Sequence, residues 1–305
     1  MQILEKINLE IYGASHQKHL GFKLSGIPKG YDIDFSLIDA LLVKRKGNSS
    51  YNTTRDKIEM YTFISGIENS VTTGETVHLD IEQSDFCSND YIKGIVRPSH
   101  ADVSAYLKFG DKYDYKGGGV FSGKMTVLYV IAGEIARQIL EQLKYNIKGY
   151  GHISKVLDFM DDNINEKTSI QCEELETSNL PIFNKQMRLE VEQTLLELKE
   201  KKESLGAKLT FKFLNVPSGL GDIFLNSFES KLSALLFSVP AVKAVEFGLG
   251  TDFTQYHGSK VLESLEVKDE KIYSSTNFNG GINGGITNGF QPLVFSCTIK
   301  PTATL

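Results

Sequence analysis

A glycine-rich stretch constrains the fold of this chain more than any other feature of its sequence. The stretch runs from Asn277 to Gly289 and contains five glycines, Gly280, Gly281, Gly284, Gly285 and Gly289. Because each glycine costs backbone entropy relative to a residue with a side chain, this density predicts positive φ angles or a close approach of the backbone to another group. Amide N–H groups freed in this way commonly face a phosphate or another anion. The two interpretations are a ligand cradle and a run of tight turns on a surface loop.

Length and composition are ordinary for a globular protein. The 305 residues allow one large domain or two closely joined ones. The hydrophobic and charged fractions, 41 % and 23 %, are typical of soluble domains. A net charge of −5 gives no support for a nucleic-acid-binding surface. The sequence has no signal-like N-terminus and no apolar run of 18 residues, so we expect a cytoplasmic protein without a membrane segment.

The cysteines predict neither a disulfide framework nor a metal site, because Cys87, Cys172 and Cys297 are odd in number and far apart. The basic residues are strongly biased, since only five of the 33 Lys and Arg residues are arginines. An arginine that is kept in such a sequence can serve planar, bidentate recognition. The alternative for each of them is a chance position on a solvated face.

Apolar alternation and helical periodicity predict an α+β fold with antiparallel sheets. The predicted strands are 21–27, 77–81, 242–247 and 290–300, and the predicted helices are 35–44, 123–143, 180–205 and 228–238. Asp34 is a candidate cap for the first helix. Helix 123–143 is apolar on most of its circumference at its start, which predicts a position in the core. The elements lack the regular alternation of a parallel doubly wound sheet, and no linker divides the chain, so we expect a single domain over residues 1–305.

Two histidines occupy turn-like settings rather than periodic faces. His16 lies in Gly13-Ala-Ser-His, and His100 lies in Arg97-Pro-Ser-His-Ala-Asp102. A histidine that is fixed in a turn beside an Arg and an Asp can act as a positioned proton donor near neutral pH. The alternative for each is a satisfied structural histidine, which is our prediction for the other four, His19, His78, His152 and His257.

A second glycine cluster precedes the predicted core helix, in the segment Lys116-Gly-Gly-Gly-Val-Phe-Ser-Gly-Lys-Met-Thr126. Its three consecutive glycines, the hydroxyl of Ser122 and the charge of Lys124 can form an anion site at a helix N-terminus. The spacing is not that of a P-loop. The alternative is a glycine-rich loop that only caps the helix.

Taken in order, these clusters resemble the motifs of the chorismate synthase family. Gly13-Ala-Ser-His16 is similar to the family's Gly-Glu-Ser-His, and Arg97-Pro-Ser-His-Ala-Asp102 to its Arg-Pro-Gly-His-Ala-Asp. The other matching segments are Lys44-Arg-Lys-Gly47, Thr53-Thr-Arg55, Ser65-Gly66, Gly117-Gly-Gly-x-x-Ser-Gly-Lys-x-Thr126, Val239-Pro-Ala-Val-Lys-Ala-Val-Glu-Phe-Gly248 and the closing glycine stretch with Lys300-Pro-Thr302. The resemblance covers essentially residues 1–305.

The resemblance implies a layered α+β fold, with helices sandwiched between antiparallel sheets, and usually a homotetramer. It implies a carbon–oxygen lyase of the shikimate pathway. The reaction is the anti 1,4-elimination of phosphate from 5-enolpyruvylshikimate 3-phosphate, which gives chorismate. The implied cofactor is reduced FMN, and NADPH is associated with the family as a reductant.

The resemblance also assigns roles to residues. It gives His16 the protonation of the leaving phosphate and His100 the protonation of the reduced flavin. Substrate and flavin are both anionic, so a pocket that holds them must present several cations, for which Lys44, Arg45 and Arg55 are the candidates toward the substrate. The implied flavin-binding residues are Ser122, Lys124, Pro240, Ala241, Gly284, Lys300, Pro301, Thr302, Ala303 and Thr304.

The sequence departs from the family pattern at several positions. Ala14 stands where the family has Glu, and Lys44 and Lys124 stand where it has Arg, which keeps the charge but gives up bidentate recognition. Other differences are Lys57, Glu59 and Val120. The sequence ends at Leu305 without the family's Arg-His-Asp-Pro segment. We therefore keep two expectations, a chorismate synthase and a flavin- or phosphate-binding homologue without turnover, of which the complete histidine pair favours the first.

Overall fold

The computed structural model describes residues 7–46, 58–83, 92 and 94–303. Backbone contacts divide the chain into two compact units, the first within residues 1–144 and the second within residues 145–304, apart from residues 49–51 and 305. Both units combine helices with antiparallel sheets, so the predicted α+β class is confirmed. The single domain expected from the absence of a linker stays a prediction.

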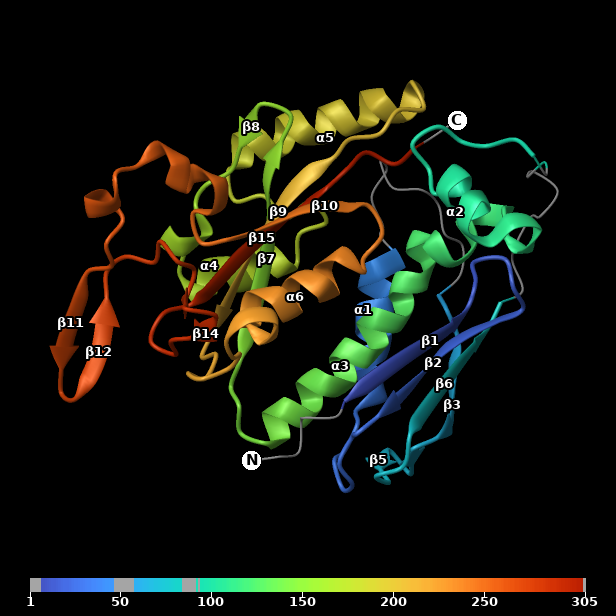
Figure 1. The fold of residues 1–305 in the computed structure, drawn as a ribbon, viewed down its shortest axis with the longest axis horizontal. Helices are drawn as coiled ribbons and strands as arrows, with labels where there is room; N and C mark the ends of the chain where they lie inside the picture. Colours follow the sequence, from blue (N-terminus) through green and yellow to red (C-terminus); the bar gives the residue numbers. More distant parts are fainter. Residues whose placement is uncertain (1–6, 47–57, 84–91, 93, 304–305) are drawn as a thin grey trace. The chain divides into compact units, whose positions relative to one another are not determined.

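The first unit is built on a four-stranded antiparallel sheet of strand order β1-β2-β6-β3 (Figure 1). The strands are β1 (Asn8–Gly13), β2 (His19–Ser25), β3 (Tyr61–Ser65) and β6 (Val77–Glu82), with a small hairpin of β4 (Ile67–Glu68) and β5 (Val71–Thr72). Its helices are α1 (Phe35–Lys46), α2 (Asp102–Phe109) and α3 (Val127–Gln142). Alternate residues of β2 and β6 are fully buried, which is the pattern of a sheet with one face on the core.

The core of the first unit lies between this sheet and two helices. Phe22 of β2 and Leu79 of β6 pack in one cluster with Ile38 of α1 and with Leu128 and Ile131 of α3. By length and composition alone, the helical stretch Lys116–Gln142 could also cross a membrane. Its apolarity is accounted for by these buried contacts, as we predicted for this helix.

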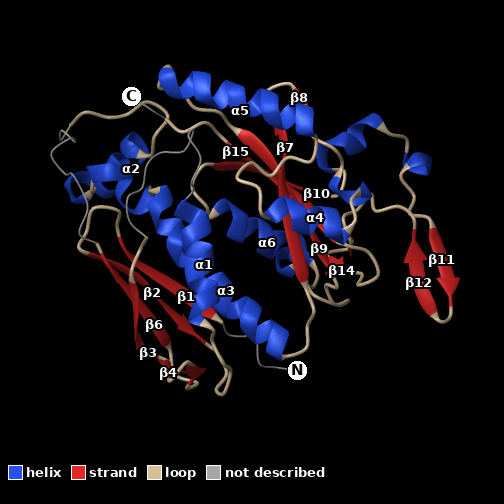
Figure 2. Ribbon diagram, turned by 180° about the vertical axis from the view of Figure 1, so that it is seen from behind, coloured by secondary structure: helices blue, strands red, loops and turns tan. Residues whose placement is uncertain are grey.

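The second unit contains a five-stranded antiparallel sheet of order β10-β15-β9-β7-β8. Its strands are β7 (Lys148–Val156), β8 (Phe159–Met160), β9 (Ala207–Leu214), β10 (Val242–Phe247) and β15 (Leu293–Ile299). Two hairpins accompany it, β11 (Leu265–Lys268) with β12 (Lys271–Ser274) and β13 (Ile282–Asn283) with β14 (Ile286–Thr287). The helices are α4 (Ser169–Glu176), α5 (Lys185–Glu200) and α6 (Phe228–Phe237), which Figure 2 shows in blue beside the red strands.

The helices of the second unit cover both faces of its sheet. Phe213 of β9 and Phe295 of β15 pack with Phe228 of α6 in one apolar cluster. The next residue of β9, Leu214, faces the opposite way and packs in another cluster with Cys172 of α4. Successive side chains of a strand point to opposite faces, so the strand is buried on both sides.

Several predicted elements are confirmed, and their ends have local causes. The predicted strand 242–247 is β10, and α1 begins at the predicted residue because Asp34 accepts a hydrogen bond from the backbone N–H of Ser36. Helix α5 begins at Lys185 rather than at residue 180, because Asn184 caps it through the N–H of Met187. Helix α3 is preceded by a 3₁₀ turn over Gly123–Thr126, so its first predicted turn is not α-helical.

Candidate functional site

The turn that carries His16 joins β1 to β2 and is fixed by a buried glutamine. The side chain of Gln83, which follows β6, donates hydrogen bonds to the carbonyl oxygens of Ala14 and Gln17 at 3.0 and 2.8 Å. Ser15 is buried, and its N–H and hydroxyl donate to the carbonyls of Gly119 and Gly117 at 3.2 and 3.1 Å. The turn is thereby attached to the second glycine cluster, about a hundred residues further along the chain.

The second glycine cluster lies directly against both candidate histidines. Gly117, Gly118 and Gly119 have φ angles of 56, 86 and 52°, a left-handed path that side chains disfavour. A Cβ atom added to Gly117 would collide with the ring of His16, and one added to Gly118 would lie 3.3 Å from Nε2 of His100. The structure therefore brings the two histidines together on consecutive glycines, and the missing side chains provide the space for the imidazole rings.

His100 is held by Asp102 at the start of α2. Its Nδ1 lies 2.7 Å from Oδ1 of Asp102, whose side chain is 3 % exposed. Arg97 binds both oxygens of the same carboxylate through its Nε and NH2 groups, each at 2.8 Å, and its backbone N–H donates to Oδ2 at 2.9 Å. The hydroxyl of Tyr113 donates to Oδ1 as well. The Arg and Asp that flank His100 in the sequence thus form its support.

The electrostatics of the two histidines differ. Burial lowers the pKa of His16, and the positive charge of Lys124 lowers it further, so that His16 is neutral at pH 7 in the protein alone. Burial by itself would raise the pKa of Asp102, but hydrogen bonds from Arg97 and Tyr113 outweigh it and hold the pKa well below its usual range. His100 therefore faces a permanent anion at Nδ1.

The predicted cations have different surroundings. Arg45 forms an ion pair with Glu59 at 2.7 Å, with side-chain exposures of 12 and 14 %, and donates to the carbonyls of Gly123 and Lys124 at 3.3 Å. It braces the glycine cluster, a role that its sequence context did not predict. Lys44 is exposed on α1, and Arg55 lies outside the described residues.

Ser122 serves the local turn. Its hydroxyl accepts a hydrogen bond from the backbone N–H of Lys124 at 3.2 Å, which caps the 3₁₀ turn ahead of α3. Capping agrees with the alternative interpretation of this cluster, and it leaves the anion-binding interpretation open, because Lys124 also lies close enough to His16 to lower its pKa.

The glycine-rich stretch of the second unit has the predicted positive φ angles at all five glycines. At four of them the close neighbour is the chain itself, because an added Cβ would crowd Val294 at Gly280, Pro292 at Gly281, Ser227 at Gly285 and Ser218 at Gly289. At these four glycines, the group that the backbone approaches is therefore the chain itself, which favours the interpretation as tight turns there. Gly284 differs, since an added Cβ there meets nothing within 4 Å.

The predicted flavin residues of the second unit fall at two ends of one strand. Gly281 packs against Pro292, just before β15, whereas the N–H of Lys300, just after β15, donates to the carbonyl of Ala241 at 2.9 Å. The strand has seven residues, which separates its ends by roughly 20 Å. Within one chain, Gly284 and the pair Ala241–Lys300 therefore belong to separate surfaces rather than to one cradle.

The corner formed by Ala241 and Lys300 also contains Pro240, Pro301 and Thr302. Ala241 has a φ of 72°, an unusual angle for alanine, and it follows Pro240 at the start of β10. Pro301 and Thr302 are exposed, and the carbonyl of Thr302 accepts a hydrogen bond from Ser204 at 2.8 Å. Ala303 ends the described chain, and Thr304 lies outside the described residues.

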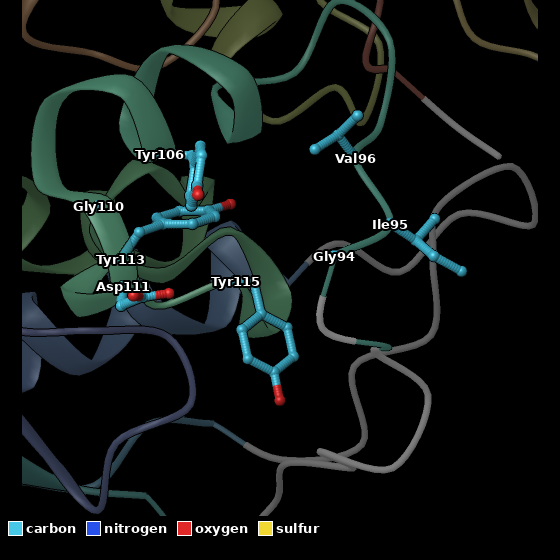
Figure 3. Close-up of a pocket in the computed structure, with 8 residues that line it drawn as sticks. All are labelled: Gly94, Ile95, Val96, Tyr106, Gly110, Asp111, Tyr113 and Tyr115. Carbon is cyan, nitrogen blue, oxygen red and sulfur yellow. The ribbon is translucent and has the colours of Figure 1, made fainter.

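A cavity of about 360 Å³ opens beside α2 in the first unit (Figure 3). Its wall contains Ile95 and Val96 and the rings of Tyr106, Tyr113 and Tyr115. Tyr113 belongs to both this wall and the support of His100. Among the described residues, no cluster of His, Cys, Asp or Glu could hold a metal ion, and Cys87 lies outside them.

Sequence reasoning missed three residues that build the site, Ser15, Gln83 and Tyr113. Each acts through a partner distant in sequence or through a turn, and Gln83 and Tyr113 have no neighbour pattern that marks them. Ser15 offered a signal, since it lies next to His16 in a motif-like segment. The other four histidines lie as predicted outside this cluster: His152, for example, pairs with Asp161 at 2.8 Å, and both side chains are buried.

Comparisons with known proteins agree on one family. A family model described as chorismate synthase matches residues 7–305. The chorismate synthase of Thermococcus gammatolerans is 35 % identical over 306 residues, covering 98 % of this chain and 82 % of the relative. That of Methanosphaera stadtmanae is 33 % identical over 314 residues, covering 99 and 82 %. A crystal structure of chorismate synthase superposes with a TM-score of 0.81 at 26 % identity, covering 98 % of this chain and 85 % of that one.

Proposed function

The chain belongs to the chorismate synthase family, and from this premise we propose how its residues carry out the reaction. It is a lyase that acts on the phosphate ester of its substrate. The substrate is 5-enolpyruvylshikimate 3-phosphate, and the reaction is the anti 1,4-elimination of phosphate to give chorismate. The observation that carries the proposal is the convergence of His16 and His100 on Gly117 and Gly118.

His16 protonates the leaving phosphate. The single hydroxyl proton of Ser15 is donated to the carbonyl of Gly117, so Ser15 accepts a hydrogen bond from Nδ1–H of His16 at 3.1 Å and leaves Nε2 as the nitrogen that exchanges protons. His16 is neutral before substrate binds, because burial and Lys124 lower its pKa. A bound phosphate dianion raises the proton affinity of a nearby imidazole. His16 therefore takes up its proton when the phosphate binds and can give it to the departing oxygen.

In His100, Asp102 fixes Nδ1, and Nε2 is the nitrogen that exchanges protons. The anionic Asp102 accepts from Nδ1–H, so Nε2, which faces Gly118, is the atom that gains or loses a proton. Reduced FMN, when bound, would supply electron density to the elimination and recover it, which leaves the reaction redox-neutral. His100 would give a proton from Nε2 to the reduced cofactor when that cofactor is bound.

The residues fit an anionic, planar cofactor in two respects. Lys124 and Lys116 bring positive charge close enough to His16 to lower its pKa, and the three glycines of the loop leave a backbone without side chains. The proposed flavin-binding residues fall into separate groups, which are Ser122 and Lys124 of the first unit, Gly284 at the β13–β14 turn of the second, and Pro240, Ala241, Lys300, Pro301, Thr302, Ala303 and Thr304 of the second. Lys44, Arg45 and Arg55 are proposed to bind the substrate, and Arg45 also braces the loop through Gly123 and Lys124.

Three further parts of the proposal rest on family membership. They are a homotetrameric assembly, a cytoplasmic location and NADPH as the source of reducing equivalents for FMN. Sedimentation analysis of the purified chain tests the first, and flavin reduction by NADPH under anaerobic conditions tests the last.

The decisive experiment is an anaerobic assay for chorismate with chemically reduced FMN. We expect turnover that falls by about 10²-fold or more in His16→Ala and His100→Ala, the usual scale of general acid catalysis. His257→Ala is the matched control, since His257 is exposed in the second unit and lies in no part of the site. Flavin and substrate binding without turnover in the wild-type chain would instead establish the binding homologue, and no flavin binding at tens of micromolar would remove the flavin assignment.

A further inference from the structure

The carboxylate of Asp102 is crowded with hydrogen-bond donors. Oδ2 accepts two hydrogen bonds from Arg97, from the backbone N–H and from Nε. Oδ1 accepts three, from NH2 of Arg97, from Nδ1–H of His100 and from the hydroxyl of Tyr113. The side chain is 3 % exposed, so these donors replace the solvent that the anion has lost.

The three donors on Oδ1 compete for the same negative charge. An anion beside an imidazole favours its protonated form, and donors that neutralise this anion weaken the effect. Asp102 is the charged group that faces His100 from its own segment, and Arg97 and Tyr113 act on His100 through it. From the glycine cluster, the backbone at Gly118 faces Nε2. The basicity of His100 thus depends on how much of the charge of Asp102 the other two donors take.

The hydroxyl of Tyr113 is placed to donate a hydrogen bond to Asp102 that does not change with pH. Tyr113 follows a 3₁₀ turn over Gly110–Lys112 at the end of α2, and its ring stands in the cavity wall between Tyr106 and Tyr115 (Figure 3). Burial, and then the hydrogen bond to Asp102, raise its pKa to about 12. The hydroxyl therefore keeps its proton near neutral pH, and it remains a donor.

We propose that Tyr113 is a positioning residue that lowers the proton affinity of His100 by sharing Oδ1 of Asp102. Its effect passes through the carboxylate and needs no contact with substrate or cofactor. The inference rests on the proposed role of His100 only for its consequence in catalysis, because the titration of His100 can be measured in the protein without ligands.

The test compares Tyr113→Phe with Tyr115→Phe. Both variants remove one hydroxyl from the same cavity, but the hydroxyl of Tyr115 makes no hydrogen bond within the described part of the chain. The histidine ring signals of the ligand-free protein are titrated by NMR, and His100→Ala assigns the resonance. We expect the ring signals of His100 to titrate at higher pH in Tyr113→Phe, because Oδ1 of Asp102 then keeps more of its charge, and to titrate as in the wild-type protein in Tyr115→Phe.

A double variant shows whether the effect passes through Asp102. In an Asp102→Asn background, Tyr113→Phe should produce no further shift, because the shared charge is already gone. In the active protein, the pH–rate profile of kcat should shift upward in Tyr113→Phe while KM stays the same. Equal titration of His100 in the two single variants, or an equal shift with and without Asp102, would overturn the proposal. Circular dichroism and the melting temperature confirm that each variant is folded.

Discussion

Glycines in the loop 116–119 leave room for histidine side chains, whereas glycines in the stretch 280–289 leave room for the chain's own backbone. In the first segment, Gly117 and Gly118 face the rings of His16 and His100. In the second, Gly281 lies against the backbone of Pro292, and Gly284 with Gly285 forms the two-residue turn between β13 and β14. Both turn residues have positive φ, as short hairpins require.

This difference separates two reasons for keeping a glycine. The residues on either side of the stretch 280–289 are held by Glu263, which accepts hydrogen bonds from Thr276, Asn279 and Gln291. Burial would raise the pKa of Glu263, but these donors lower it below its usual value. The second segment thus serves the folded structure, with Glu263 accepting several hydrogen bonds beside it. The first segment makes room for the two candidate catalytic histidines. Substitutions in the first should damage turnover, and substitutions in the second should damage stability.

The largest expected effect is on turnover in His100→Ala. The variant removes a side chain for which the first segment makes room, and we expect kcat to fall by about 10² to 10⁴-fold. The melting temperature should change little, because the ring is replaced in a partly exposed site. A near-normal rate in the anaerobic chorismate assay would make His100 a structural residue and remove the contrast between the two segments.

Gly117→Ala should mimic the loss of His16 without changing that residue. The added methyl group collides with the ring of His16 and has to displace it, so kcat should fall by about 10²-fold. The matched control is Gly123→Ala in the same loop, where an added Cβ meets nothing within 4 Å. If both variants lose activity equally, any substitution in the loop lowers turnover, and the contact between Gly117 and His16 does not explain the loss.

In the second segment, Gly281→Ala and Gly284→Ala form a matched pair. Gly281 has a φ of 81°, and an added Cβ lies 2.6 Å from the carbonyl oxygen of Pro292, so we expect a loss of about 2 to 3 kcal/mol in the free energy of unfolding. Gly284 has a φ of 61° and open space, so its loss should be about 1 kcal/mol. Urea denaturation measures both, and flavin titration of Gly284→Ala tests its proposed contact with the cofactor. Equal losses of stability would show that φ alone decides the cost.

The smallest effect concerns the proton affinity of His16. The charge of Lys124 lowers the pKa of His16, so Lys124→Met should move the pKa up toward its ordinary value. A histidine with a lowered pKa makes the folded state less stable as the pH falls below the ordinary value, because the unfolded chain binds the proton first. The variant should therefore lose less stability on acidification. The pH dependence of His16 modification by diethyl pyrocarbonate, mapped by mass spectrometry, measures the shift, and a downward shift would contradict the assigned cause.

Sequence reasoning singled out the two candidate histidines, but it predicted less of the architecture around them. His16 and His100 stand in short motifs, so local residues sufficed to single them out, but their common position against the glycine cluster was not predicted and is shown by the structure. Strands β7 and β9 were not predicted. Gly149 and Gly151 interrupt the apolar pattern of β7, and Lys208 and Lys212 interrupt that of β9. Tertiary contacts overrode both local signals.

The function of the five glycines at 280–289 could not be decided from sequence. Positive φ followed from their density, but whether the neighbour was a ligand or the chain depended on Pro292, Ser218 and Ser227, which no local rule connects with them. Arg45 shows the same limit, because its partners Gly123 and Lys124 lie 78 and 79 residues away. Motifs identify reactive side chains, and long-range packing decides what surrounds them.

The attachment of the His16 turn also governs when the site can exist. Ser15 and Gly117 are 102 residues apart, and Gln83 and Ala14 are 69 apart. Contacts of such long range require the closure of large loops, which local structure does not reward, so they form late in folding. During synthesis, more than a hundred residues therefore follow His16 before the loop that positions its ring has been made. The first unit has to be translated as far as the glycine cluster before any part of the reaction geometry appears.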